Sequence, residues 1–150
     1  MPQIKNQIHS LLLISIIALL ALGSFTAAFA EENGHHRLVI QVSTNDPQTQ
    51  KIALNNAVNL QKHYGMDNVD IEIVAYGPGL GLMTKKSKEA SRVKSLAMQN
   101  ITFSACGNTM DKVERKTGKK PVLTDGVGMV QAGVVRILEL QEEGYAYLRP

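Results

Sequence analysis

The fold is best predicted from residues 38–76, which read LVIQVSTNDPQTQKIALNNAVNLQKHYGMDNVDIEIVAY. An aliphatic run opens this stretch and is typical of a buried strand. Asp46 and Pro47 then supply an N-cap followed by proline at the first helical position, and Gly65 ends a helix whose apolar residues recur at helical spacing. A second strand follows at 69–76. The resulting β-α-β pattern predicts two parallel strands joined by a right-handed crossover.

The remainder of the chain continues this alternation. A glycine-rich turn is expected at 77–81, followed by a helix of roughly a dozen residues that ends near Gln99. A strand at 101–105 and a short helix after Cys106, closed by Gly118, come next. The chain then continues with a strand at 123–127, a helix marked by Val130, Val134, Ile137 and Leu138, and a strand at 145–148. Strands that alternate with helices throughout predict a three-layer α/β domain with a mainly parallel sheet.

The first thirty residues have the features of a secretory signal peptide. They contain no acidic side chain, carry the base Lys5, continue through an uncharged apolar stretch and end in Ala28-Phe29-Ala30. We therefore expect cleavage after Ala30 and export, to the periplasm or outside the cell, with no stable membrane anchor. An uncleaved anchor is the competing interpretation, because residues 11–30 are just long enough to cross a bilayer. The predicted organisation is a signal peptide (1–30), a flexible tail (31–36) and one α/β domain (37–150).

Composition excludes several classes of protein. The chain has 150 residues, of which 44% are hydrophobic and 19% charged, so we expect one globular domain. A single cysteine excludes an internal disulfide framework and any multi-cysteine metal site. The net charge of +3 is too small to predict a nucleic-acid partner. His35-His36 with Glu31-Glu32 would bind a metal only weakly in a flexible tail, so we predict neither a metal nor a cofactor.

Cys106 is the main candidate for chemistry, because it directly follows a predicted strand and precedes a helix. We expect Asn108 to be the N-cap, with Asp111 completing a capping box. Unpaired amide N–H groups and the helix dipole would then stabilise a thiolate and lower the cysteine pKa. A single cysteine is also often just a small buried apolar residue, and the local sequence leaves both interpretations open.

The glycine-rich stretch at 77–81 differs from a dinucleotide-binding loop. Leu82 stands where the G-x-G-x-x-G pattern requires its third glycine, and no P-loop lysine follows in the required arrangement. We interpret the stretch as a tight turn that leaves space over the edge of the sheet and forms one wall of a Cys106 pocket.

Two groups of basic residues lie near these motifs in the sequence. Such runs are usually solvated faces, but if both flank the strand-end edge they would attract anions or an acidic partner. The first group is Lys85, Lys86, Lys88, Arg92 and Lys94, and the second is Arg115, Lys116, Lys119 and Lys120.

From about Arg37 to Pro150, the chain resembles the DsrE/DsrF-like family of small sulfur-handling proteins. The most specific part is FSACGNTM at 103–110, and residues 76–79, 131–135 and 139–148 also match the family pattern. This resemblance implies a three-layer α/β/α sandwich with a five-stranded parallel sheet and assembly as a trimer or hexamer. In the sulfur-relay members, a cysteine in the loop after the third strand carries sulfur as a persulfide, and Cys106 matches that position.

The leading hypothesis is therefore an exported sulfur carrier or sulfurtransferase. The Cys106 thiolate would take sulfur from a sulfane-sulfur donor, hold it as a persulfide and pass it to the thiol of an acceptor protein. A lone cysteine suits a carrier, because no internal thiol can discharge the bound sulfur as a disulfide. The residues predicted to bind substrate or stabilise its charge are Gly77, Gly79, Gly107, Asn108 and Thr109.

Two other functions remain open for the same fold. The protein could be a non-catalytic oligomeric binding module in which Cys106 is inert. It could also be a thiol redox sensor that forms a mixed or intersubunit disulfide at Cys106 in an oxidising compartment.

Overall fold

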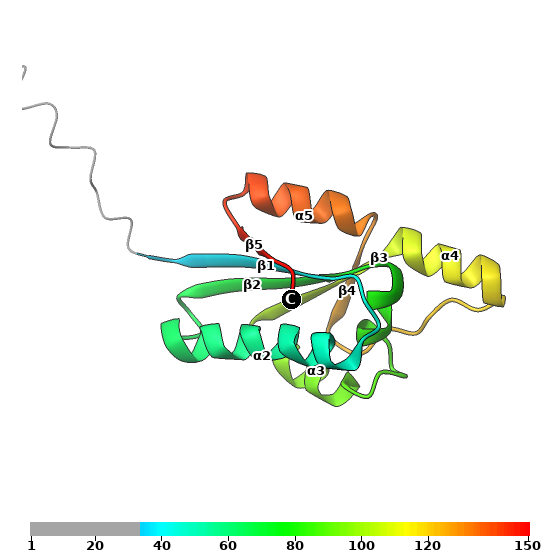
Figure 1. Ribbon diagram of the computed structural model, residues 1–150, viewed down its shortest axis with the longest axis horizontal. Helices are drawn as coiled ribbons and strands as arrows, with labels where there is room; N and C mark the ends of the chain where they lie inside the picture. Colours follow the sequence, from blue (N-terminus) through cyan, green and yellow to red (C-terminus); the bar gives the residue numbers. More distant parts are fainter. Residues whose placement is uncertain (1–33) are drawn as a thin grey trace, which may run out of the picture. The chain divides into compact units, whose positions relative to one another are not determined.

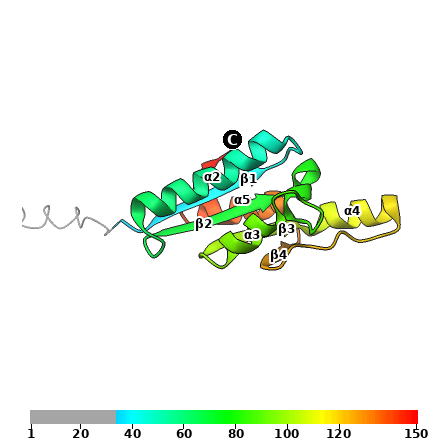
Figure 2. The same ribbon diagram turned by 90° about the horizontal axis from the view of Figure 1, so that it is seen from below.

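A computed structural model describes residues 34–150, which form a five-stranded β-sheet with helices on both faces (Figures 1 and 2). All four pairings between neighbouring strands are parallel, and the strand order is β4-β3-β2-β1-β5. The strands are β1 (His36–Val42), β2 (Val69–Ala75), β3 (Ile101–Cys106), β4 (Val127–Val130) and β5 (Ala146–Leu148). The predicted α/β sandwich with a five-stranded parallel sheet is confirmed.

The helices are distributed over both faces of the sheet. Figure 1 shows α2 and α3 below the sheet and α5 above it, while α4 extends past the ends of the strands. The helices are α2 (Pro47–Tyr64), the 3-10 helix η1 (Gly77–Met83), α3 (Ala90–Ala97), α4 (Gly107–Thr117) and α5 (Gly133–Glu142). Because every strand runs in the same direction, the carboxyl ends of β1 to β4 and the loops that follow them lie at one edge of the sheet.

The first crossover forms as the sequence predicts. Asp46 accepts a hydrogen bond of 2.7 Å from the backbone N–H of Thr49, and Pro47 occupies the first position of α2. The helix ends at Gly65, whose φ of +88° lies in a region that residues with a side chain rarely adopt. The buried face of α2 packs on the sheet through Ala53, Leu54 and Ala57.

The two faces of the sheet bury different amounts of apolar surface. The larger core lies against α2, η1 and α3, and Ile40, Ile73 and Phe103 are among its fully buried side chains. A smaller core lies against α5 and consists of Val39, Val74, Ile137 and Leu140. Successive residues of a strand point to opposite faces, so central strands buried on both faces read as nearly continuous apolar runs.

The fourth strand lies later in the chain than predicted. The expected strand at 123–127 is wrong, because β4 covers Val127–Val130. The backbone N–H of Thr124 donates to the carbonyl of Met83 (2.8 Å), and the carbonyl of Val122 accepts from Lys85 (3.0 Å). The segment around Leu123 therefore pairs with the loop after η1, and pairing with β3 begins only after the turn at Gly126.

Two helices also differ from their expected extent. The helix expected to end near Gln99 is shorter, since α3 covers only Ala90–Ala97. Val130 belongs to β4 rather than to the last helix, which begins at Gly133. Within α5, Val134 and Leu138 are exposed, and Ile137 is the one residue of the expected set that is buried.

The N-terminal predictions fall largely outside the described residues. The signal peptide predicted at 1–30 and residues 31–33 of the predicted tail lie there, while His36 already belongs to β1. Among residues 34–150, no helix combines the length and apolar character needed to cross a membrane.

Candidate functional site

Cys106 lies at the carboxyl edge of the sheet, where it is both the last residue of β3 and the N-cap of α4. Ala105 belongs to the core on the α2 face, so alternation along the strand directs Cys106 toward α5. Only 5% of Cys106 is exposed. The sulfur is therefore buried, but it lies at the start of a helix.

Hydrogen-bond donors from two helices influence the Cys106 thiol. The largest single effect is burial, which raises the pKa of the thiol. Hydrogen bonds from the Thr109 hydroxyl and from the backbone N–H groups of Gly133, Thr109 and Asn108 lower it. Together these hydrogen bonds outweigh burial, so the pKa of Cys106 lies below its ordinary value. The thiolate form is correspondingly more populated at neutral pH than in a free cysteine.

Thr109 connects the cysteine with the glycine-rich stretch. Its hydroxyl oxygen accepts a hydrogen bond of 3.0 Å from the backbone N–H of Gly77 while its hydroxyl group donates toward Cys106. A donor that is itself held by another hydrogen bond is oriented before any charge develops on the sulfur. Gly77 and Thr109, both predicted as site residues, are thus brought together with Cys106.

The predicted capping of α4 is wrong. The helix begins two residues earlier than expected, with Cys106 rather than Asn108 at the N-cap and no side-chain capping hydrogen bond. The backbone N–H of Asn108 donates to the carbonyl of Gln131 (3.1 Å), and its effect on the cysteine pKa is the smallest of those that lower it. Asp111 does not complete a capping box and instead pairs with Lys120 at 3.0 Å.

Two of the predicted glycines are positions where backbone segments approach closely. A Cβ atom on Gly79 would lie 2.1 Å from the carbonyl oxygen of Val42, at the end of β1. The expectation that the turn leaves open space over the sheet is therefore wrong at Gly79, because backbone fills that space. A Cβ atom on Gly107 would lie 3.1 Å from the carbonyl oxygen of Val130.

Gly133 is a site residue that sequence reasoning missed. It is the first residue of α5, and a Cβ atom there would lie 3.4 Å from the Cβ of Cys106 and 3.1 Å from the ring of Tyr76. Its location follows from the sheet, since Cys106 pairs in register with Val130 of β4 and α5 begins just beyond that strand. The available signal was a glycine directly before an apolar helix, but its proximity to Cys106 depends on the pairing of β3 with β4.

A small cavity of about 220 Å³ adjoins this region. It lies between the start of α4, the end of β4 and α5, and its lining includes two neighbours of the sulfur site, Asn108 and Val130. The other lining residues are Gln131, Ala132, Val135, Arg136 and Glu139.

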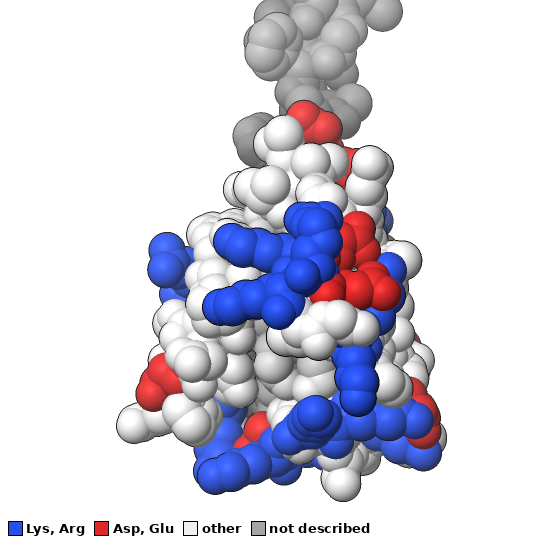
Figure 3. Space-filling view, turned by 90° about the vertical axis from the view of Figure 1, so that its right-hand side faces the viewer, with Lys and Arg blue, Asp and Glu red and all other residues white. Residues whose placement is uncertain are grey.

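Basic side chains gather at the same end of the domain. Figure 3 looks onto the end at which α4 lies and shows lysine and arginine side chains around an uncharged area. A groove of about 810 Å³ is lined by lysines from both predicted groups, namely Lys85 and Lys86 from the first and Lys119 and Lys120 from the second. Both groups therefore contribute to one surface next to Gly77, which also lines the groove.

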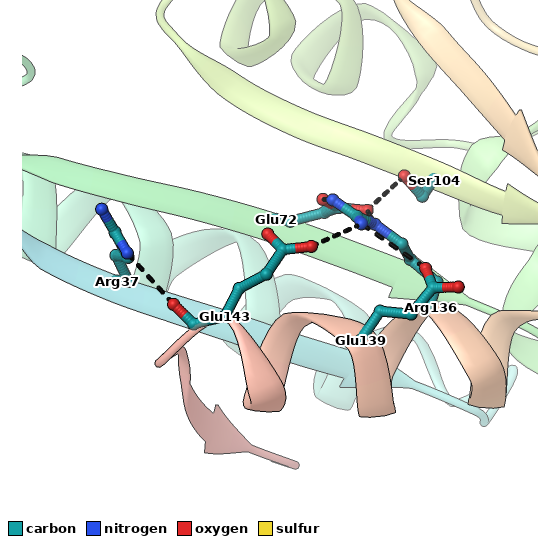
Figure 4. Close-up of polar contacts among 6 residues, drawn as sticks. All are labelled: Arg37, Glu72, Ser104, Arg136, Glu139 and Glu143. Atoms are coloured by element: carbon teal, nitrogen blue, oxygen red, sulfur yellow. Dashed lines mark hydrogen bonds and ion pairs between the residues drawn. The ribbon is translucent and has the colours of Figure 1, made fainter.

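A buried carboxylate connects α5 with the centre of the sheet (Figure 4). Glu72 of β2 is only 4% exposed, and its two carboxylate oxygens accept hydrogen bonds of 3.1 and 2.8 Å from Arg136 of α5. The hydroxyl of Ser104 donates to the same carboxylate at 2.6 Å. Arg136 also contacts Glu139 of α5 and Glu143, which directly follows the helix, and its pairing with Glu72 raises its pKa. Arg136 lies one helical turn after Gly133, so this pair helps to hold the start of α5 beside Cys106.

The histidines near the N-terminus have other contacts. His35 Nε2 lies 2.8 Å from a carboxylate oxygen of Asp70, and the His36 ring packs against Tyr64 with ring centroids 3.7 Å apart. Within residues 34–150, no three His, Cys, Asp or Glu side chains lie close enough together to hold a metal ion.

These features define a class of protein: an α/β domain with an all-parallel five-stranded sheet and a cysteine of lowered pKa where two helices begin. The chain matches the model of the DsrE/DsrF-like family over residues 36–150, and it belongs to this family. The comparison with curated proteins finds no match.

The solved structures that match this chain include the following two. MTH1491 from Methanobacterium thermoautotrophicum, described as a protein of unknown function, is 33% identical with a TM-score of 0.68. The ychN protein from E. coli is 15% identical with a TM-score of 0.60 and supports the fold alone. Each match covers 77% of this chain and 99% of the other.

Proposed function

We propose that the protein is a sulfur carrier or sulfurtransferase in which Cys106 is the nucleophile that forms a persulfide. The observation that carries this proposal is the lowered pKa of Cys106, caused by the hydrogen bonds from Thr109 and Gly133. Thiolate is the nucleophilic form of cysteine, and the same N–H and O–H donors would stabilise a persulfide anion. Membership of the DsrE/DsrF-like family agrees with this chemistry.

The reaction begins when the Cys106 thiolate attacks the sulfane sulfur of a donor such as thiosulfate. A bond forms between Cys106 Sγ and that sulfur, while the sulfur–sulfur bond of thiosulfate breaks and sulfite leaves with the electron pair. The product is a Cys106 persulfide anion. An acceptor thiolate then attacks the outer sulfur, takes it as its own persulfide and releases the Cys106 thiolate.

Mass spectrometry of the intact protein tests the transfer. After incubation with thiosulfate or polysulfide and removal of excess reagent, the wild-type protein should carry one extra sulfur atom, which a reducing agent removes. Cys106→Ser should carry none. Retention of the extra sulfur by Cys106→Ser, or its absence from folded wild-type protein under both donors, would refute the assignment.

Burial favours a competing proposal, in which Cys106 is inert and the protein is a binding module. With 5% exposure, the sulfur meets reagents only when neighbouring residues move. An inert cysteine predicts almost no alkylation by iodoacetamide at any pH. A carrier predicts alkylation whose rate, plotted against pH, has its midpoint below that of a free cysteine. A redox sensor predicts instead a mixed or intersubunit disulfide at Cys106 after mild oxidation, visible on a non-reducing gel.

We also propose that the protein assembles as a homo-oligomer, a trimer or hexamer. The support is an exposed apolar face of α5, formed by Val134, Val135 and Leu138. Contiguous apolar residues on a surface are typical of protein–protein interfaces.

Export is the third part of the proposal and rests on the N-terminal sequence. Cleavage after Ala30 predicts that mature protein recovered from cells begins at Glu31. N-terminal sequencing tests this, and replacement of Ala28 and Ala30 by Phe should leave the precursor uncut. Recovery of the uncleaved protein, still beginning at Met1, in the membrane fraction of the cells would support the anchor instead.

A further inference from the structure

The groove beside η1 has two walls that come from distant parts of the chain. One wall is η1 with the residues that follow it, and the other is the last part of α4 with residues 119–122. Backbone hydrogen bonds join the walls, from Lys85 N–H to the carbonyl of Val122 and from Thr124 N–H to the carbonyl of Met83. The groove is therefore held in shape by the fold and does not depend on a ligand to form.

The interior of the groove is apolar. Leu80 is buried at its base, and Val113 packs against the main core from α4. Pro78, Pro121 and Val122 complete the apolar lining, and Val122 keeps 65% of its surface exposed. A hollow of about 810 Å³ with this lining is in the size range of sites for organic molecules.

The rim of the groove is cationic. Lys85, Lys86, Lys119 and Lys120 line it, and its lining includes no Asp or Glu. Lys85 pairs with Asp125, and Lys120 pairs with Asp111. Within residues 34–150, Lys86 and Lys119 form no ion pair. Two ammonium groups are thus available to an anion at the mouth of an apolar hollow.

We propose that this groove binds an amphipathic organic anion, a molecule with an apolar body and a carboxylate, sulfonate or phosphate group. The apolar body would fill the hollow over Leu80 and Val113, and the anionic group would lie between Lys86 and Lys119. A small inorganic anion would leave the apolar lining unfilled, whereas a neutral apolar molecule would leave the ammonium groups unused. This inference does not depend on the persulfide chemistry proposed for Cys106.

Binding of anilinonaphthalene sulfonate to the purified protein tests the proposal by fluorescence titration. The expected result is one binding site per chain, and the neutral analogue N-phenylnaphthylamine should bind roughly tenfold or more weakly. The double variant Lys86→Glu/Lys119→Glu should weaken sulfonate binding by roughly tenfold or more, since it reverses both available charges. Val122→Glu should do the same, because it places a carboxylate on the apolar wall.

Matched controls separate this groove from other apolar surfaces. Lys51→Glu reverses an exposed lysine of α2, and Met98→Glu replaces an exposed apolar residue at the end of α3, so both should bind the probe as the wild type does. The same titration on Cys106→Ser should give unchanged affinity, which keeps this result separate from the persulfide experiment. Circular dichroism confirms that each variant is folded.

Three outcomes would overturn the proposal. Equal affinity for the sulfonate and its neutral analogue would show that the lysines do not select an anion. Unchanged affinity in folded Val122→Glu and in the double lysine variant would place the probe elsewhere. Failure of the wild type to bind the probe, together with a fall in oligomeric mass on Val122→Glu, would show that a second copy covers the groove.

Discussion

At the scale of single residues, the Cys106 site depends on groups that reach it from three segments. Thr109 contributes a hydroxyl from α4, Gly133 contributes an N–H from α5, and Gly77 orients the Thr109 hydroxyl from η1. Each donor favours the charged form of the sulfur against the effect of burial. Removal of one donor should therefore raise the pKa of Cys106 without changing the fold.

Thr109→Val tests this arrangement, because it removes the hydroxyl and nearly keeps the shape of the side chain. The pKa of Cys106 should rise, and the rate of alkylation at neutral pH should fall by about fivefold, which corresponds to the loss of one hydrogen bond of about 1 kcal/mol. Rates of iodoacetamide labelling as a function of pH measure both quantities. Thr109→Ser keeps the hydroxyl, so the midpoint of its alkylation rate against pH should equal that of the wild type. An unchanged midpoint in Thr109→Val would contradict the role of this donor.

The same pKa determines how stability depends on pH. The folded-state pKa of Cys106 is depressed, so its stabilising effect is present above the unfolded-state pKa and is lost as pH falls through the folded-state pKa. Between these two values, wild-type protein should gain stability relative to Cys106→Ser as the pH rises. Urea unfolding of both proteins across this window measures the difference.

Gly79 predicts a second effect at this scale, on stability alone. Gly79→Ala would place a Cβ atom 2.1 Å from the Val42 carbonyl oxygen, so backbone must shift. We expect a loss of about 2 kcal/mol or more in the free energy of unfolding, measured in urea. Gly81→Ala is the matched control, since nothing lies within 4 Å of its Cβ position. Equal stability of the two variants would contradict the close packing of η1 on β1.

At the scale of secondary-structure elements, the central observation is the attachment of α5 to the sheet through Glu72 and Arg136. The carboxylate is buried, and its two oxygens accept hydrogen bonds from the guanidinium and from Ser104. A buried charge that loses its partner is costly, because water cannot replace the lost hydrogen bonds. This pair therefore affects both the stability of the domain and the placement of Gly133.

Arg136→Met should lower the free energy of unfolding by about 3 kcal/mol, because Glu72 would remain buried without its cation. The start of α5 should also be held less firmly, so the midpoint of Cys106 alkylation should shift upward. Glu139→Gln is the control, because it removes only an exposed contact of Arg136 and should change stability by about 0.5 kcal/mol or less. This role of the pair would be contradicted if Arg136→Met had the wild-type free energy of unfolding and the wild-type pH midpoint of Cys106 alkylation.

The elements also show where sequence patterns are sufficient and where they fail. The β-α-β unit was predicted closely, since its N-cap, proline, glycine and apolar spacing all act locally. The fourth strand was misplaced because residues around Leu123 are apolar enough for a strand but pair with the loop after η1. The capping of α4 was misassigned because β3 runs directly into the helix, so Asn108 lies inside it.

At the scale of the whole domain, parallel pairing gathers separate segments at one edge of the sheet. The strand order places β4 beside β3. The chain then returns through α5, on the face of the sheet opposite to α2 and α3, and reaches β5 at the far edge. Its inner side covers Val39 and Val74, while its outer side exposes apolar residues. That outer side is the surface on which the proposed oligomer depends.

Leu138→Glu should reduce the mass of the protein in solution to that of a monomer, because it places a charge on the exposed apolar face of α5. Leu138 is 57% exposed, so the substitution should leave the fold of a single chain intact. Light scattering coupled to size-exclusion chromatography measures the mass. Met98→Glu, on the other side of the sheet, should keep the wild-type mass. A monomeric wild-type protein would contradict the proposed assembly.

The sequence by itself determined the fold class, the β-α-β unit and the location of Cys106 between a strand and a helix. It could do so because apolar periodicity, caps and turn residues act over a few neighbouring positions. Only the tertiary structure decided that Gly133 and Gly77 meet at the cysteine, that Arg136 pairs with Glu72, and that two lysine groups share one groove. These arrangements join residues far apart in the chain, and they depend on strand order and helix packing, which no local pattern encodes.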